Sequence, residues 1–109
     1  MINIDEFKKI EIKIGEILTA EKVEGTDKLV RFTVDFKEEV PRQILSGIAL
    51  HFPDPQALVG KKFPFVTNLE PRTIRGHESN GMIMAVSDSE GGFALLEPTS
   101  PIIAGSQIS

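Results

Sequence analysis

Along the first third of the chain, apolar and polar residues alternate in the way that half-buried β-strands require. Isoleucines at positions 10, 12 and 14 are separated by charged residues, which predicts a strand that bends at Gly15 and continues to residue 18. A turn is expected at 25–27. Apolar residues at 32, 34 and 36 then alternate with polar ones, which predicts a second strand with Arg31 and Thr33 facing solvent or a ligand.

The rest of the chain supplies three more strands and a short helix. Residues 42–48, 63–68 and 81–87 are predicted strands, and the last has apolar residues on both faces, which predicts a central position in the sheet. Segment 53–60 has Pro near its start and Gly after its end, as short helices do. Two flanking elements are expected: a short helix at 5–9, and short extra strands or an extended segment after residue 92.

Five principal strands with a short helix between the third and fourth form the element order of an OB-fold. This all-β, partly open barrel often binds oligonucleotides or oligosaccharides. A small β-sandwich is the alternative, and periodicity alone does not separate the two. Because 109 residues suit one domain, we expect a single domain over residues 1–109.

The amino-acid composition excludes several kinds of chemistry. The chain has no cysteine, which excludes disulfides, thiolate metal sites and a cysteine nucleophile. No apolar run approaches the roughly 18 to 20 residues that span a bilayer, and the first residues lack a secretory pattern, so we expect a cytoplasmic protein. A pI near 5.1 and the absence of Trp and Tyr argue against a nucleic-acid binder that works by bulk charge or aromatic stacking.

The net charge of −4 conceals a segregation along the chain. Residues 1–27 carry −3, residues 28–77 carry +3 with eight basic side chains, and residues 78–109 carry −4 without any Lys or Arg. The middle of the chain is therefore able to present a basic face between acidic ends. The alternative is that folding disperses these charges over the surface.

No arrangement typical of an enzyme is present. His51 and His77 have no metal-ligand spacing, and no nucleophile elbow, P-loop or dinucleotide motif occurs. We interpret the two histidines as structural, with His77 in a loop. The acidic pair at 38–39 lies in an expected hairpin loop without apolar neighbours to raise a pKa. We therefore expect no enzyme activity, no metal and no cofactor.

The segment 68–82 is polar and rich in turn residues. Arg72 and Arg75 are able to donate planar paired hydrogen bonds to phosphates or base edges, and Gly76 and Gly81 allow a close approach of the backbone. On an OB-fold this segment joins strands four and five and borders the usual oligonucleotide groove. The alternative is a long solvated hairpin.

These residues, taken together, resemble the tRNA-binding domain that forms the C-terminal module of methionyl-tRNA synthetase, stand-alone tRNA-binding proteins and endothelial-monocyte-activating-polypeptide-like proteins. The similarity spans nearly the whole chain, and the order and spacing of its short motifs make it specific. The matching positions are Ile14-Gly15, Thr26 to Leu29, Val34-Asp35, Arg42 to Ile48, Leu58 to Lys61, Asn68 to Arg72, Arg75-Gly76, Ser79, Gly81-Met82 and Gly105-Ser106.

The resemblance implies an OB-fold that binds tRNA by shape, and a homodimer formed through the two ends of the chain. The RNA-binding positions that it implies are Lys28, Arg42, Ser46, Asn68, Arg72, Arg75, Ser79 and Met82. For Ser46 and Ser79 a hydrogen bond to the backbone is the alternative role. For Met82 the alternative is core packing.

Three functions of the whole chain remain in competition. The first is a structure-selective tRNA-binding module that acts as a homodimer or in trans with an aminoacyl-tRNA synthetase. The second is an export chaperone of the CsaA type, a related subgroup that binds unfolded polypeptides. A bare protein-interaction domain, such as a detached synthetase subunit, is a third.

Overall fold

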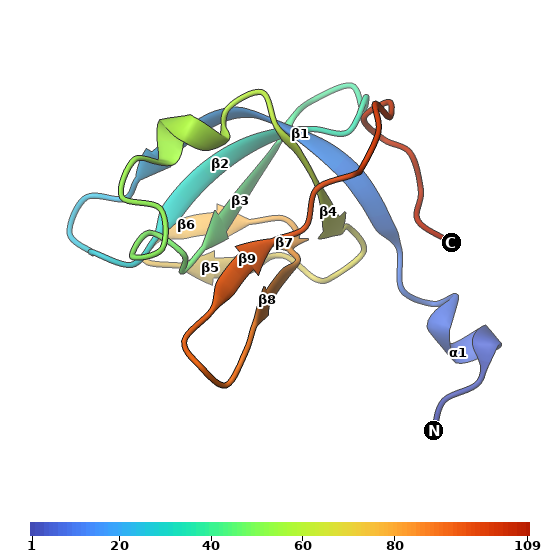
Figure 1. The fold of residues 1–109 in the computed structure, drawn as a ribbon. Helices are drawn as coiled ribbons and strands as arrows, with labels where there is room; N and C mark the ends of the chain where they lie inside the picture. The colour runs from blue at the N-terminus through green and yellow to red at the C-terminus, as the bar shows by residue number, and fades with distance from the viewer.

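A five-stranded antiparallel sheet forms the centre of the computed structural model, which describes residues 1–109 (Figure 1). Its strands, in spatial order, are β3 (Arg42–Ser46), β2 (Val30–Asp35), β1 (Ile12–Lys22), β4 (Lys62–Val66) and β7 (Met82–Ile83). The two edges of this sheet approach each other, because Leu45 on β3 donates its amide to the Ser79 hydroxyl and Asn80 donates its amide to the Gln43 carbonyl. The sheet is thus a nearly closed barrel. The predicted all-β fold of OB type is confirmed.

Alternation along the strands builds the core of this barrel. Val30, Phe32 and Val34 on β2 are fully buried, whereas the residues between them are half exposed. Each large apolar side chain removed from water in this way contributes about 1.5 to 3 kcal/mol. Gly15 lets β1 pack closely on β2, since a Cβ there would lie 2.5 Å from Val34 Cγ1. The core therefore leaves no room for a side chain at this glycine.

The predicted short helix between the third and fourth strands is present as a 3-10 helix, η1 (Pro55–Leu58). Asp54 caps it by accepting a hydrogen bond from the Gln56 amide, and Leu58 is buried under the barrel. The Gln56 side chain donates to the Ala20 carbonyl at 2.6 Å. These contacts fix η1 against the far end of β1.

The N-terminal helix α1 (Ile4–Phe7) buries none of its residues within the chain. A capping box closes its first turn: the Asn3 side chain accepts from the Glu6 amide, and Glu6 reaches back to the Asn3 amide. Figure 1 shows α1 projecting from the barrel. So short a helix gains little stability from its own hydrogen bonds.

The prediction of a central fifth strand over 81–87 was wrong. The strand is an edge of the sheet and ends after Ile83, and β8 (Ala85–Ser87) leaves the barrel to pair with β9 (Phe93–Leu95). Proline chemistry explains the break. Met84 donates to the Pro64 carbonyl, but Pro64 has no N–H with which to continue that ladder. Val86, beyond the break, is half exposed.

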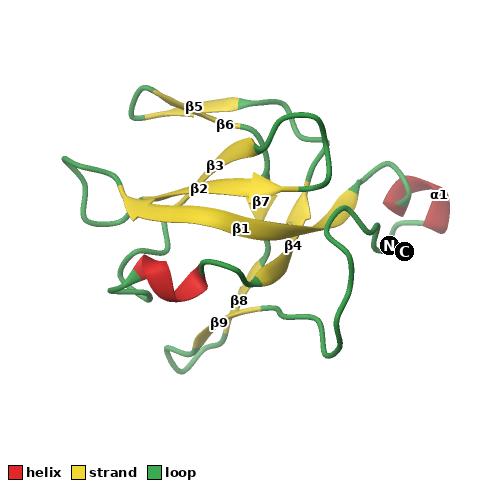
Figure 2. Cartoon of the chain, turned by 90° about the horizontal axis from the view of Figure 1, so that it is seen from above, coloured by secondary structure: helices red, strands yellow, loops and turns green.

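The segment 68–82 folds into a hairpin of its own, made of β5 (Arg72–Ile74) and β6 (His77–Ser79). His77, expected in a loop, therefore begins a strand. Figure 2 shows the β5–β6 hairpin and the β8–β9 hairpin on opposite sides of β1. The first of these hairpins carries both arginines of the polar segment.

Candidate nucleic-acid interface

The β5–β6 hairpin presents its two arginines to solvent. Its strands are joined by a two-residue turn in which Arg75 has φ 53° and Gly76 has φ 80°. Two positive φ values in succession match the right-handed twist of a hairpin. Arg75 thus lies at the tip and Arg72 at the base, and both side chains are exposed.

Hydrogen bonds hold this hairpin against the edge of β3. The Ser79 hydroxyl accepts from the Leu45 amide at 3.0 Å and donates to the Gly81 carbonyl at 3.3 Å. The Gln43 side chain donates to the Glu78 carbonyl at 2.9 Å. Ser79 is 4% exposed, so its hydroxyl serves the backbone in this structure and positions the neighbouring residues.

Arg42 closes one end of the barrel. Its guanidinium donates to both carboxylate oxygens of Glu38, at 2.9 and 2.8 Å, and to the Thr67 carbonyl at 2.6 Å. It also lies over the Phe36 ring, 5.4 Å from the centroid. The hydrogen bonds from Arg42 hold the pKa of the Glu38 carboxyl below its ordinary value. The charge of Arg42 is therefore neutralised within the chain.

Half of the basic residues of segment 28–77 form ion pairs within the chain. Four of the eight basic residues pair with carboxylates, and the Lys62 ammonium donates to the Ile102 carbonyl. Arg31 pairs with Glu21 and also contacts His77 Nδ1 at 3.3 Å. The three that have no ion pair or side-chain hydrogen bond are Lys28, Arg72 and Arg75, called here the free cations. The basic face is reduced to these three.

Lys28 and Arg75 lie at the same end of the barrel. Lys28 belongs to the loop between β1 and β2, and Figures 1 and 2 both place this loop near the turn of the β5–β6 hairpin. The contact between Arg31 and His77 joins β2 to the same hairpin. Ser46, at the end of β3, pairs in register with Val30 and is half-buried. This end of the molecule therefore combines an exposed cation from each of two loops.

Two other predicted residues lie at the opposite end of β3, with Arg42. Asn68 accepts from the Glu11 amide at 2.8 Å and donates to the Lys9 carbonyl at 2.7 Å, which ties the segment after α1 to the barrel. Met82 on β7 is 47% exposed. It is thus a surface residue and not part of the core.

Sequence reasoning missed two features of this region. Lys22, at the end of β1, is a further exposed cation without an ion pair and lies next to the loop that holds Lys28. The second feature is a hollow of about 430 Å³ between β3, the β2–β3 loop and β6, lined in part by Gln43, Glu78 and Asn80. The only sequence signal for Asn80 was its position between Ser79 and Gly81.

No group of three or more His, Asp or Glu side chains comes together in a way that could hold a metal ion. None of the helices has the length and apolar character that crossing a membrane would take.

Comparison with known proteins identifies the family. Residues 12–107 match the family described as "Putative tRNA binding domain". The chain is 44% identical over 108 residues to "Methionine--tRNA ligase" of Enterococcus faecalis, and 49% identical over 108 residues to that of Helicobacter pylori. Each match covers 99% of this chain but 16% of the relative. The chain belongs to the tRNA-binding domain family.

Solved structures agree with this assignment. A methionyl-tRNA-synthetase-related protein from Pyrococcus horikoshii superposes with a TM-score of 0.93 at 38% identity, covering 100% of this chain and 98% of the other. The chaperone CsaA from Bacillus anthracis superposes with a TM-score of 0.87 at 26% identity, covering 100% and 99%. The chaperone alternative thus has a structural neighbour, and the family match favours tRNA binding.

Proposed function

We propose that this chain is a non-catalytic module that binds tRNA by its shape and acts in the cytoplasm. The observation that carries the proposal is the grouping of the free cations Lys28, Arg72 and Arg75 around β3 and the β5–β6 hairpin, in a chain whose net charge is −4. Such side chains hold phosphates, and the acidic remainder opposes indiscriminate binding. Membership of the tRNA-binding domain family supports the same reading.

The residues at the two ends of β3 bind different parts of the RNA in this proposal. Lys28 and Arg75 hold phosphates at one end, and Arg72 adds a planar guanidinium at the base of the hairpin. At the other end, Asn68 and Met82 offer a polar and an apolar contact to exposed bases or 2′-hydroxyls. Arg42 and Ser79 fix the backbone around these residues, because Arg42 donates to the Thr67 carbonyl and Ser79 accepts from the Leu45 amide.

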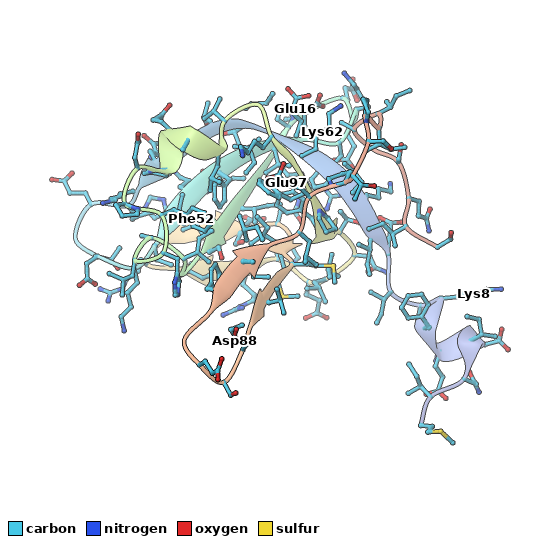
Figure 3. The ribbon with its side chains drawn as sticks, in the orientation of Figure 1. Lys8, Glu16, Phe52, Lys62, Asp88 and Glu97 are labelled. Atoms are coloured by element: carbon cyan, nitrogen blue, oxygen red, sulfur yellow. The ribbon has the colours of Figure 1, made fainter.

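The proposal includes a homodimer formed through the chain ends. Ile4, Phe7 and Ile10 line an apolar hollow of about 580 Å³ with Ile108. Figure 3 shows Lys8, at the end of α1, on an arm well separated from the barrel. Because α1 buries nothing in its own chain, a second copy is the partner that would cover these side chains. Action in trans with an aminoacyl-tRNA synthetase is the related alternative, supported by the synthetase relatives.

A fluorescence titration with total tRNA across a salt series tests the proposal. Three or four phosphate contacts per protomer give a slope of log K against log salt of about −2 to −4, and engagement of both protomers of a dimer doubles it. Absence of binding at low salt would overturn the proposal. Sedimentation at micromolar concentration tests the dimer separately, and a monomer would overturn that part alone.

The chaperone reading is the second candidate, favoured by the likeness to CsaA over the whole chain. An unfolded peptide is therefore titrated beside the tRNA. Arg72→Glu combined with Arg75→Glu is expected to reduce tRNA affinity by an order of magnitude or more and to leave peptide binding unchanged. Peptide binding without any tRNA binding would decide for the chaperone.

A further inference from the structure

None of the free cations lines the hollow between β3, the β2–β3 loop and β6. It measures about 430 Å³, and five polar side chains line it: Glu38, Arg42, Gln43, Glu78 and Asn80. It adjoins the β5–β6 hairpin, in which Arg72 pairs in register with Ser79, the residue before Asn80. A group bound in the hollow would therefore lie next to the β5–β6 hairpin.

Asn80 is held in place by its backbone while its side chain stays free. Its amide donates to the Gln43 carbonyl at 2.8 Å, and the preceding Ser79 is anchored by its buried hydroxyl. The following Gly81 has φ 141°, and a Cβ there would lie 2.8 Å from Ile44 Cδ1. The Asn80 side chain is half-buried and makes no hydrogen bond within the chain. It is a preorganised donor and acceptor without a partner.

The Gln43 side chain is oriented by a hydrogen bond of its own. Its Nε2 donates to the Glu78 carbonyl at 2.9 Å, which fixes the amide and leaves Oε1 without a partner. The Glu78 carboxylate also has no partner in the chain. The hollow therefore offers more acceptors than donors, and all of them come from groups whose backbone is fixed.

This charge pattern selects the kind of ligand. The carboxylates of Glu38 and Glu78 repel a phosphate, and Arg42 does not offset them because Glu38 already engages its guanidinium. A neutral planar group with amino donors suits the same lining. Adenine, cytosine and guanine each present an exocyclic amino group, and Asn, Gln and Glu are side chains that recognise such edges. Uracil presents carbonyl oxygens, which an acceptor-rich lining disfavours.

We infer that this hollow is a subsite for one unpaired amino-bearing base of a bound RNA (adenine, cytosine or guanine, as opposed to uracil), with Asn80 and Gln43 reading the edge of the base. The inference rests on the proposed function and deepens it. The free cations hold phosphates, while the hollow supplies a base preference that shape recognition alone does not give.

Competition of labelled tRNA by penta-adenylate, penta-cytidylate and penta-uridylate tests the inference, because the three competitors carry equal numbers of phosphates. The adenylate and cytidylate are expected to compete about fivefold or more better than the uridylate. Asn80→Ala should bring the three competitors within about twofold of one another and weaken tRNA binding about 5- to 10-fold, with an unchanged salt slope. Ser89→Ala, on the opposite hairpin, is the control and should match the wild type.

Glu78→Gln is expected to strengthen RNA binding, whereas Asn80→Ala is expected to weaken it. Loss of the carboxylate should strengthen binding of the uridylate and of tRNA while reducing the preference for amino-bearing bases. Equal competition by the three oligonucleotides on the wild type, or an Asn80→Ala protein with wild-type preference, would overturn the subsite and leave the proposed function standing. Absence of tRNA binding by the wild type would instead overturn the proposed function. Thermal unfolding of each variant at the wild-type temperature shows that the fold is intact.

Discussion

Replacement of Arg72 and Arg75 by glutamine tests whether phosphate binding resides on the β5–β6 hairpin. Both side chains are exposed, and neither has an ion pair or a side-chain hydrogen bond within the chain. The double substitution removes two charges without leaving a buried partner unsatisfied. We therefore expect the stability of the domain to change by less than about 0.5 kcal/mol, as for ordinary surface substitutions.

The size of the binding effect follows from counterion release. Each lost phosphate contact lowers the slope of log K against log salt by about 0.7 for single-stranded and 0.9 for duplex RNA-like partners. Two lost contacts lower the slope by about 1.4 to 1.8. At a salt concentration of about 0.1 M, this corresponds to an affinity about 25- to 60-fold weaker.

The assay is a tRNA titration at four or more salt concentrations, with Lys37→Gln combined with Lys61→Gln as the matched control. The control removes the same two charges, but from lysines that pair with Asp35 and Glu97. Its slope should stay close to that of the wild type. Equal slopes for the two double variants would refute the reasoning, since binding would then depend on net charge and not on the hairpin.

Three further outcomes concern stability. Hydrogen bonds from Arg42 hold the pKa of the Glu38 carboxyl below its ordinary value, so this carboxyl contributes stability above its unfolded pKa, and that stability is lost as pH falls through the folded value. The thermal unfolding temperature should therefore fall more steeply between about pH 6 and pH 3 for the wild type than for Glu38→Gln. Gly15→Ala places a Cβ 2.5 Å from Val34 Cγ1, so urea unfolding should show a free energy of unfolding lower by about 1 to 3 kcal/mol. An unchanged midpoint would mean that the neighbouring core side chains move aside without cost. Asn68→Ala removes the two hydrogen bonds that hold the arm after α1, so limited proteolysis should cut this arm faster while amide exchange in the barrel stays as in the wild type.

The strands that bury one regular face were predictable from the sequence. The alternation in β2 predicted its buried residues, and Pro and Gly marked the short helix before β4. The fifth strand was placed wrongly because apolar residues at 82–86 do not show where the neighbouring strand lacks an amide donor. Pro64, some twenty residues away, decides where that pairing ends.

The residue types of the candidate site were predictable from the sequence, but which of its basic side chains form ion pairs was not. The sequence shows which residues are basic, whereas the pairing of Arg31 with Glu21 and of Arg42 with Glu38 depends on strand neighbours and on a hairpin loop. A hairpin was one of the two alternatives for segment 68–82, but the strands β5 and β6 were not predicted, because they have three residues each and their Arg-Gly turn lacks the usual Asn-Gly signal. Short polar strands leave no hydrophobic period to detect.

The pairing of Arg31 with Glu21 has a consequence for how the affinity of such a domain is able to change in evolution. The guanidinium already lies beside the hairpin that carries Arg75, so its contribution is withheld by one exposed carboxylate and not by distance. A single Glu21→Gln change would release a cation at the correct place without adding a basic residue. Affinity in this scaffold is therefore adjusted as readily by loss of an acid as by gain of a base, and each such step leaves the core untouched.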